Sequence, residues 1–101
     1  MNVTTVTVVR IYLSEAKGEL QGLLTTLHDQ EKVRGLTVFR GVSGFGRTGK
    51  IHSSSLLDLS MDLPIVIEFF DDPPKIASIL EHLSEQIDPG HLISWTAEMN
   101  S

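Results

Sequence analysis

Residues 63–70, with the sequence LPIVIEFF, decide the fold of this chain. The run is apolar apart from one glutamate and rich in β-branched and aromatic side chains, which is typical of a buried β-strand. Successive side chains of a strand point to opposite faces of the sheet, so Ile67 and Phe69 lie on one face and Val66 and Phe70 on the other. Because both faces are apolar, we expect cover on both sides of this strand.

The part of the chain before this strand predicts a strand, a helix and a second strand. Residues 3–13 are rich in valine and threonine, which favours a strand, and Ser14 is placed to cap a following helix. Over residues 15–31 alanine and leucine recur mostly at spacings of three and four, which puts them on one helical stripe. Gly35 supplies the stop signal for that helix, and residues 36–42 predict the second strand.

The part of the chain after residue 70 predicts a second helix and a last strand. Asp71 and Asp72 precede two prolines, an arrangement of N-cap and first turn that favours the start of a helix. Isoleucine and leucine mark an apolar helical stripe through residues 76–87, and the Asp-Pro-Gly turn at residues 88–90 closes it. In residues 93–99 apolar and polar side chains alternate, so this strand has one apolar face.

These elements follow one another in the order β-α-β-β-α-β, which predicts an α+β, ferredoxin-like sandwich. In that arrangement an antiparallel sheet carries both helices on one face, and a long loop joins the second and third strands. We expect residues 1–101 to form a single domain of this kind. The other face of the sheet is then bare and apolar, so we expect another copy of the chain to cover it.

The loop between the second and third strands differs in charge from the rest of the chain. The whole chain has 13 acidic and 8 basic side chains, yet residues 32–57 contain no Asp or Glu. At the centre of this segment, residues 41–50 read GVSGFGRTGK, in which glycines leave backbone N–H groups accessible and cations favour a phosphate or carboxylate. We expect the loop to bind an anion; a solvated hairpin loop without a ligand is the alternative. The cations of the segment are Lys32, Arg34, Arg40, Arg47 and Lys50.

Composition excludes several classes of function. The chain has no cysteine, so disulfides, thiolate metal sites and a cysteine nucleophile are impossible. Its formal net charge of -5 argues against a nucleic-acid partner, whose phosphates require a basic face. The first residues lack the pattern of a signal peptide, and no apolar run reaches about 18 residues. We therefore expect a cytoplasmic protein that does not insert into a membrane.

Two nucleotide-binding motifs match the glycine-rich run but not its context. Residues 44–49 fit G-x-G-x-x-G, and residues 44–50 fit the first part of a P-loop. A P-loop requires Ser or Thr after its lysine, where this chain has Ile51. A Rossmann fingerprint opens the first strand-to-helix turn of a parallel sheet, whereas these glycines join the second and third strands. Both of those folds are therefore disfavoured.

Residues 44–46 (GFG), 49–53 (GKIHS) and 58–69 (DLSMDLPIVIEF) resemble a PII-like family of small bacterial and archaeal proteins in the CutA and PII superfamily. Most members are described only as a domain of unknown function. The resemblance covers nearly the whole chain and is most specific over residues 41–71. It implies a ferredoxin-like fold, a trimer whose sheets line the centre, and ligands in clefts between subunits beside a flexible loop. PII proteins usually bind adenine nucleotides, so the resemblance implies a signalling or regulatory protein with such a ligand.

The chain departs from the PII pattern in two places. PII proteins place a second glycine- and lysine-rich turn against the phosphates after the second helix, whereas residues 88–91 read Asp-Pro-Gly-His here. Without Lys or Arg in that turn, a mononucleotide, a diphosphate or another anion is left open as the ligand. The loop also lacks the modifiable tyrosine of PII proteins, since the only tyrosine is Tyr12.

The ligand site is predicted in the loop. Its glycines are expected to offer backbone donors and its cations to neutralise charge, while Phe45 stacks on a base or plugs the cleft. No metal site is predicted, because no two histidines have the spacing of a helical ligand pair. No cofactor is predicted either. The residues assigned to ligand binding are Arg40, Gly44, Phe45, Gly46, Arg47, Gly49, Lys50 and His52.

Three hypotheses for function remain open. The first is a regulatory trimer whose loop, residues 43–61, orders around an anionic metabolite and so presents or hides a surface for a protein partner. The second is an enzyme that acts on a phosphorylated small molecule with His52 as acid or base. No catalytic residue is assigned, because His52 and Ser53 point opposite ways on an extended segment and no acid lies beside them in the sequence. The third hypothesis is a structural accessory protein without a ligand.

Overall fold

The computed structural model describes residues 1–14, 18–45, 51–53 and 63–101, with residues 51–53 described by their backbone alone. In chain order its elements are β1 (Val3–Ser14), α1 (Leu20–Thr25), η2 (Thr26–Gln30), β2 (Gly35–Arg40), β3 (Ser43–Phe45), β4 (Ile51–Ser53), β5 (Pro64–Asp71), α2 (Pro73–Leu83) and β6 (Leu92–Asn100). The segment η2 is a turn of π-helix that continues α1 directly.

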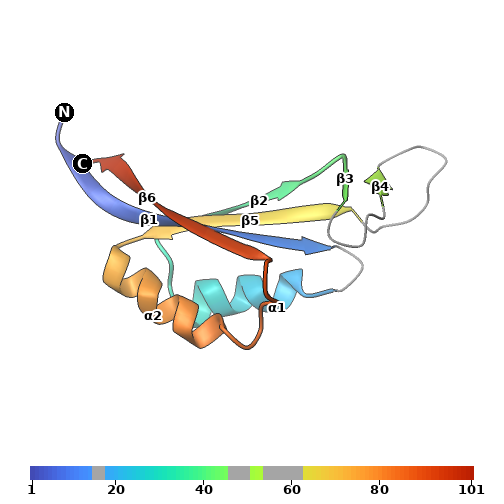
Figure 1. Cartoon of the computed structure of the whole chain (residues 1–101). Coiled ribbons are helices and arrows are strands. Elements are labelled where there is room, and N and C mark those ends of the chain that lie inside the picture. Colours follow the sequence, from blue (N-terminus) through green and yellow to red (C-terminus); the bar gives the residue numbers. More distant parts are fainter. Residues whose placement is uncertain (15–17, 46–50, 54–62) are drawn as a thin grey trace.

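The long strands form one antiparallel sheet in the order β2-β5-β1-β6, and α1, η2 and α2 all lie on the same face of it (Figure 1). This arrangement confirms the predicted ferredoxin-like α+β fold. A second, two-stranded sheet of β3 and β4 forms a hairpin at one end of the molecule (Figure 1). The sequence predicts only a loop there, because three-residue strands leave too short a pattern to detect.

The core lies between the helices and the sheet. Val9 and Ile11 of β1 stand directly opposite Phe69 and Ile67 of β5, and all four are fully buried. The apolar stripes of the helices close over them, as their spacing predicts. The buried helical residues of this cluster are Leu23, Leu27, Ile76, Ile79 and Leu83.

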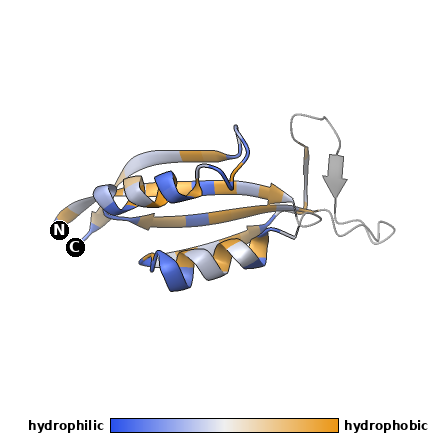
Figure 2. Ribbon diagram, turned by 90° about the horizontal axis from the view of Figure 1, so that it is seen from below, coloured by the Kyte–Doolittle hydropathy of each residue, from blue (hydrophilic) through white to orange (hydrophobic). Residues whose placement is uncertain are grey.

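The other face of the sheet carries no helix in the described part of the chain, and we call it the helix-free face (Figure 1). In β6 the apolar residues Ile93 and Trp95 pair with Arg10 and Val8, so they point to this face, away from the helices. They are 48% and 40% exposed. Figure 2 views the molecule from the side of the helices and shows hydrophobic stretches along the strands, interrupted by hydrophilic ones. The residues on this face include Val6, Val8, Arg10 and Tyr12 of β1, Gly35, Thr37 and Phe39 of β2, Val66, Glu68 and Phe70 of β5, and Ile93, Trp95, Ala97 and Met99 of β6, of which Val6 is buried.

The predicted start of the first helix is wrong. Ser14 is the last residue of β1, where it pairs with Pro64, and α1 begins at Leu20 with Glu19 as its N-cap residue. Cross-strand pairing to the end of β1 therefore overrides the local capping signal of the serine.

The predicted ends of both helices also need correction. Gly35 begins β2, and the turn after η2 is made by Lys32, whose φ of 53° is left-handed. The carbonyl oxygen of Lys32 accepts a hydrogen bond of 2.6 Å from the ammonium of Lys75, which holds this turn without a glycine. Helix α2 ends at Leu83, and the backbone N–H of Ile87 still donates to the Leu83 carbonyl at 3.2 Å.

Asp71 has a role other than the predicted helix cap. The N-cap residue of α2 is Asp72, while the side chain of Asp71 is buried and accepts hydrogen bonds from the backbone N–H groups of Arg34 (2.9 Å) and Asp72 (2.8 Å). The ammonium of Lys75 lies 3.0 Å away. Burial alone would raise the pKa of Asp71, but the hydrogen bonds from Asp72, Lys75 and Arg34 outweigh it and lower the pKa below its usual value near 3.8.

Replacing Asp71 tests this buried junction. We expect Asp71→Asn to lower the free energy of unfolding by about 1–3 kcal/mol, because the charge-assisted hydrogen bonds are lost. The pKa of Asp71 is lowered in the folded state, so its contribution is complete above the unfolded pKa and disappears as pH falls through the folded pKa. Urea unfolding from pH 7 down to strongly acidic pH measures both effects.

Asp72→Asn is the matched control, since Asp72 is exposed and its oxygen lies 4.0 Å from Arg34. It should cost clearly less than the replacement of Asp71. A difference between wild type and Asp71→Asn that stays constant through the acidic range would contradict the role assigned to the carboxylate.

Candidate functional site

Four strand ends meet at the end of the sheet that carries the hairpin. Ser14 at the end of β1 stands opposite Pro64 at the start of β5, and Arg40 at the end of β2 pairs with Ile65. The backbone N–H of Tyr12 donates to the carbonyl of His91, just before β6, at 2.8 Å. The loop between β2 and β5 and the connection between α2 and β6 therefore leave the sheet at the same end (Figure 1).

The base of the hairpin is fixed against Pro64. The backbone N–H of Gly41 donates to the Pro64 carbonyl at 2.8 Å. A Cβ atom on Gly41 would lie 2.6 Å from the ring Cγ of Pro64, and one on Gly44 would lie 3.4 Å from it. The chain thus crosses the proline ring at a distance that requires glycine at position 41.

The structure describes only part of the predicted ligand site. Arg40 is the last residue of β2, Gly44 and Phe45 belong to β3, and His52 of β4 stands directly opposite Gly44. The side chain of Phe45 is 74% exposed, so its ring is available to a ligand or to another chain. The remaining predicted residues, Gly46, Arg47, Gly49 and Lys50, lie outside the described residues, and the assignment of all eight stays a prediction.

Two cations of the basic segment have a different place. Lys32 and Arg34 precede β2, at the end of that strand opposite to the hairpin. A guanidinium N–H of Arg34 donates to the sulfur of Met99 at 3.1 Å, and the guanidinium lies 4.0 Å from Asp72. These two cations thus belong to the junction around Asp71. Of the other cations of the segment, the structure describes Arg40, which ends β2 at the hairpin.

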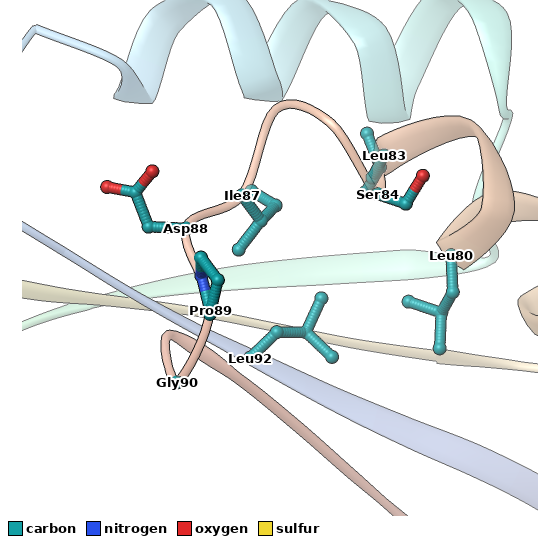
Figure 3. A pocket seen from close by; sticks show the side chains of 8 residues that line it. All are labelled: Leu80, Leu83, Ser84, Ile87, Asp88, Pro89, Gly90 and Leu92. Carbon is teal, nitrogen blue, oxygen red and sulfur yellow. The ribbon is translucent and has the colours of Figure 1, made fainter.

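An open, largely apolar cavity of about 270 Å³ lies at the α2–β6 connection (Figure 3). Leu80, Ile87 and Leu92 turn their side chains toward it, while the carboxylate of Asp88 points away from them (Figure 3). Sequence reasoning missed this cavity because the spacing of Leu80 and Ile87 is that of ordinary core residues. The residues that line it are Leu80, Leu83, Ser84, Ile87, Asp88, Pro89, Gly90 and Leu92.

A larger, open groove of about 620 Å³ runs between α1–η2 and the start of β2. Its lining combines apolar side chains such as Leu24 and Leu36 with His28, Asp29 and Arg34, and it contains none of the predicted site residues. Across the described ranges, no three His, Cys, Asp or Glu residues are placed to hold a metal ion. The helices of the same ranges are all too short or too polar to cross a membrane.

Gly41→Ala tests the anchor of the hairpin. The added methyl would meet the Pro64 ring, so we expect the base of the hairpin to shift and the free energy of unfolding to fall by about 1–3 kcal/mol. Gly22→Ala is the control, because nothing lies within 4 Å of a Cβ at that helical position. The control should stabilise the protein by roughly 0.5–1 kcal/mol. Equal unfolding midpoints for the two variants in urea would contradict the close approach to Pro64.

Comparisons with known proteins identify a family for this chain. The family model DUF190, described as "Uncharacterized ACR, COG1993", matches residues 6–99. A UPF0166 protein of Aquifex aeolicus (strain VF5) is 36% identical over 87 residues, which cover 82% of this chain and 83% of that protein. The UPF0166 protein MJ1524 of Methanocaldococcus jannaschii is 32% identical over 91 residues, which cover 85% of this chain and 82% of that protein.

Solved structures share the fold. CPII from Thiomonas intermedia K12, in a structure bound to ADP and bicarbonate, superimposes with a TM-score of 0.72 at 22% identity over 99% of this chain and 93% of that one. A putative PII-like signaling protein from Thermus thermophilus gives a TM-score of 0.63 at 18% identity over 98% of this chain and 91% of that one. The PII-like resemblance expected from the sequence is confirmed. By its match over residues 6–99 and its identity to UPF0166 proteins, this chain belongs to the DUF190 family.

Proposed function

We propose that this protein is a PII-like regulatory module that binds an adenine nucleotide beside the loop between β2 and β5. The observation that carries the proposal is the position of the glycine-rich run, residues 41–50, which starts where Gly41 is held against Pro64. The same end of the sheet holds the α2–β6 connection with its apolar cavity. CPII, which shares the fold, has been solved with ADP, AMP and bicarbonate bound, and this supports a nucleotide as the ligand.

In this proposal the ligand is held by three kinds of group. The glycines of the loop donate backbone N–H groups to phosphate oxygens, and the three cations assigned from the sequence neutralise their charge. The exposed ring of Phe45 stacks on the base. His52, which stands opposite Gly44 on the facing strand, is assigned to the ligand from the sequence alone. The loop, residues 43–61, then changes its surface toward a protein target in the cytoplasm, without turnover of the nucleotide.

The charge around the α2–β6 connection limits the number of phosphates. Residues 84–91 contain Glu85 and Asp88 and no Lys or Arg, and they lie at the same end of the sheet as the hairpin. Each further phosphate brings more negative charge toward these carboxylates. We therefore propose a mono- or diphosphate of adenosine as the ligand, rather than a triphosphate.

We also propose that the protein, one domain over residues 1–101, works as a homotrimer with ligand sites in the clefts between subunits. The helix-free face supports self-association, because Phe39, Ile93 and Trp95 are 49%, 48% and 40% exposed on it. Covering large apolar side chains contributes roughly 25 cal/mol for each Å² removed from water. The PII-like resemblance implies the number three, and a closed rotation lets every copy cover the face of its neighbour.

Charge reversal in the loop tests the ligand site. The double variant Arg47→Glu and Lys50→Glu should bind ADP and AMP at least ~100-fold more weakly in isothermal titration calorimetry, because two attractions become repulsions. The control is Lys32→Glu, which makes the same change in charge as either single reversal. Lys32 lies beyond the other end of β2, so this variant should leave the affinity for ADP and AMP nearly unchanged. Unchanged affinity in the double variant refutes the assignment of Arg47 and Lys50 to ligand binding. Steady turnover of the nucleotide by wild type would instead favour an enzyme.

Sedimentation velocity tests the assembly. At micromolar concentration wild type should sediment with three times the 11.1 kDa mass of the chain. Trp95→Glu should dissociate the assembly because it places a charge on the helix-free face. Thr96→Glu is the matched control, since it adds the same charge to the opposite face of the same strand, and it should remain a trimer. A monomeric wild type would rule out self-association through this face.

A further inference from the structure

An ion pair lies on the helix-free face, between apolar side chains of the two central strands, and Thr37 of β2 stands opposite its carboxylate. Arg10 of β1 and Glu68 of β5 stand directly opposite each other on the two central strands of the sheet. The Nε–H of Arg10 donates to a carboxylate oxygen of Glu68 at 2.7 Å, and the side chains are 42% and 27% exposed. The guanidinium carbon lies 5.5 Å from the centre of the Trp95 ring, which adds a cation–π contact from β6.

The surroundings of the pair are apolar along both central strands. Val8 and Phe70 form the next cross-strand pair toward one end of the sheet, and Tyr12 and Val66 form the next pair toward the other end. Each central strand therefore places one charge between apolar neighbours on this face, and the two charges have opposite sign. The hydrogen bond from Arg10 to Glu68 is the largest cause that raises the pKa of the guanidinium. An arginine is charged throughout the physiological pH range, so the pair carries one charge of each sign.

When another copy covers the helix-free face, Arg10 and Glu68 need new hydrogen-bond partners. An arginine has several N–H donors in a fixed fork, and a carboxylate has two acceptor oxygens, so the contacts within one chain leave hydrogen-bonding capacity on both groups. Water satisfies that capacity while the face is exposed. When another copy excludes the water, unsatisfied donors and acceptors become costly, and the covering surface must supply partners.

A second copy of the chain supplies those partners itself. It brings one cation and one anion on the same face, so the surface complements its own charge when copies are related by a closed rotation. We propose that, in the self-association proposed above on which this inference rests, Arg10 of each copy also binds Glu68 of the neighbouring copy. The alternating charges then close a ring that fixes the rotation of the copies relative to one another. The apolar side chains around the ring supply most of the affinity.

Single charge reversals and their mixture test the ring. Arg10→Glu gives a face with two carboxylates and Glu68→Arg a face with two guanidinium groups, so each variant alone should associate at least ~10-fold more weakly than wild type. In an equimolar mixture, a mixed trimer joins opposite charges at two of its three contacts and like charges at the third. Native mass spectrometry, with one variant labelled with ¹⁵N, should therefore find mixed oligomers that associate more strongly than either single variant but more weakly than wild type. The combined variant Arg10→Glu with Glu68→Arg should associate like wild type.

Each outcome decides between a ring and a pair that acts inside one chain. If the combined variant recovers but the mixture associates no more strongly than either single variant, the pair acts only within each chain and the proposal is overturned. Single reversals that associate like wild type overturn it as well. Circular dichroism of every variant separates loss of association from loss of folding. A monomeric wild type instead refutes the self-association itself, which distinguishes the two failures.

An apolar replacement keeps the test decisive if the reversed variants do not fold. Arg10→Met with Glu68→Leu retains the size of the side chains and removes both charges. We expect this protein to associate into a broader distribution of oligomer sizes than wild type, because apolar contacts alone do not fix the rotation. A single oligomer of wild-type size and equal or greater affinity would overturn the ring.

Discussion

Strand β5 needs an apolar layer on both of its sides, and the rest of the molecule follows from that constraint. Ile67 and Phe69 are shielded completely by the helices, whereas Val66 and Phe70 on the reverse side are only partly buried. The described helices cover a single face of the sheet (Figure 1). The proposed self-association supplies the second layer, so in that proposal the folded chain and the assembled protein are different units.

The sequence predicted the fold from long-range regularities and failed where tertiary contacts decide. The apolar residues on both faces of β5 and the apolar stripes of the helices extend over many residues, and they predicted the correct order of strands and helices and the correct layers of the fold. The ends of the helices depend on single residues, and the boundaries predicted from Ser14 and Gly35 are wrong. Both residues belong to strands, where Ser14 pairs with Pro64 and Gly35 pairs with Phe70. Lys32 takes the left-handed turn instead, supported by a hydrogen bond from a residue 43 positions away.

In the candidate site, too, some features can be predicted from the sequence and others depend on tertiary contacts. Glycines and cations between the second and third strands are visible in the sequence, but their individual tasks are not. Gly41 is needed for its contact with Pro64, and Arg34 belongs to the junction around Asp71. The pair of Arg10 and Glu68 joins residues 58 positions apart, so no local pattern reveals it until the strand register is known.

The contact between Gly41 and Pro64 also has a thermodynamic consequence. Pro64 opens the strand that carries Glu68, so the floor of the proposed ligand site and the proposed surface for self-association are parts of one strand. If both proposals hold, whatever favours one position of this strand favours it at both sites, and the two equilibria are linked reciprocally. Dilution of the protein would then weaken its apparent affinity for the metabolite, so the amount of the chain in the cell would set the sensitivity of the response.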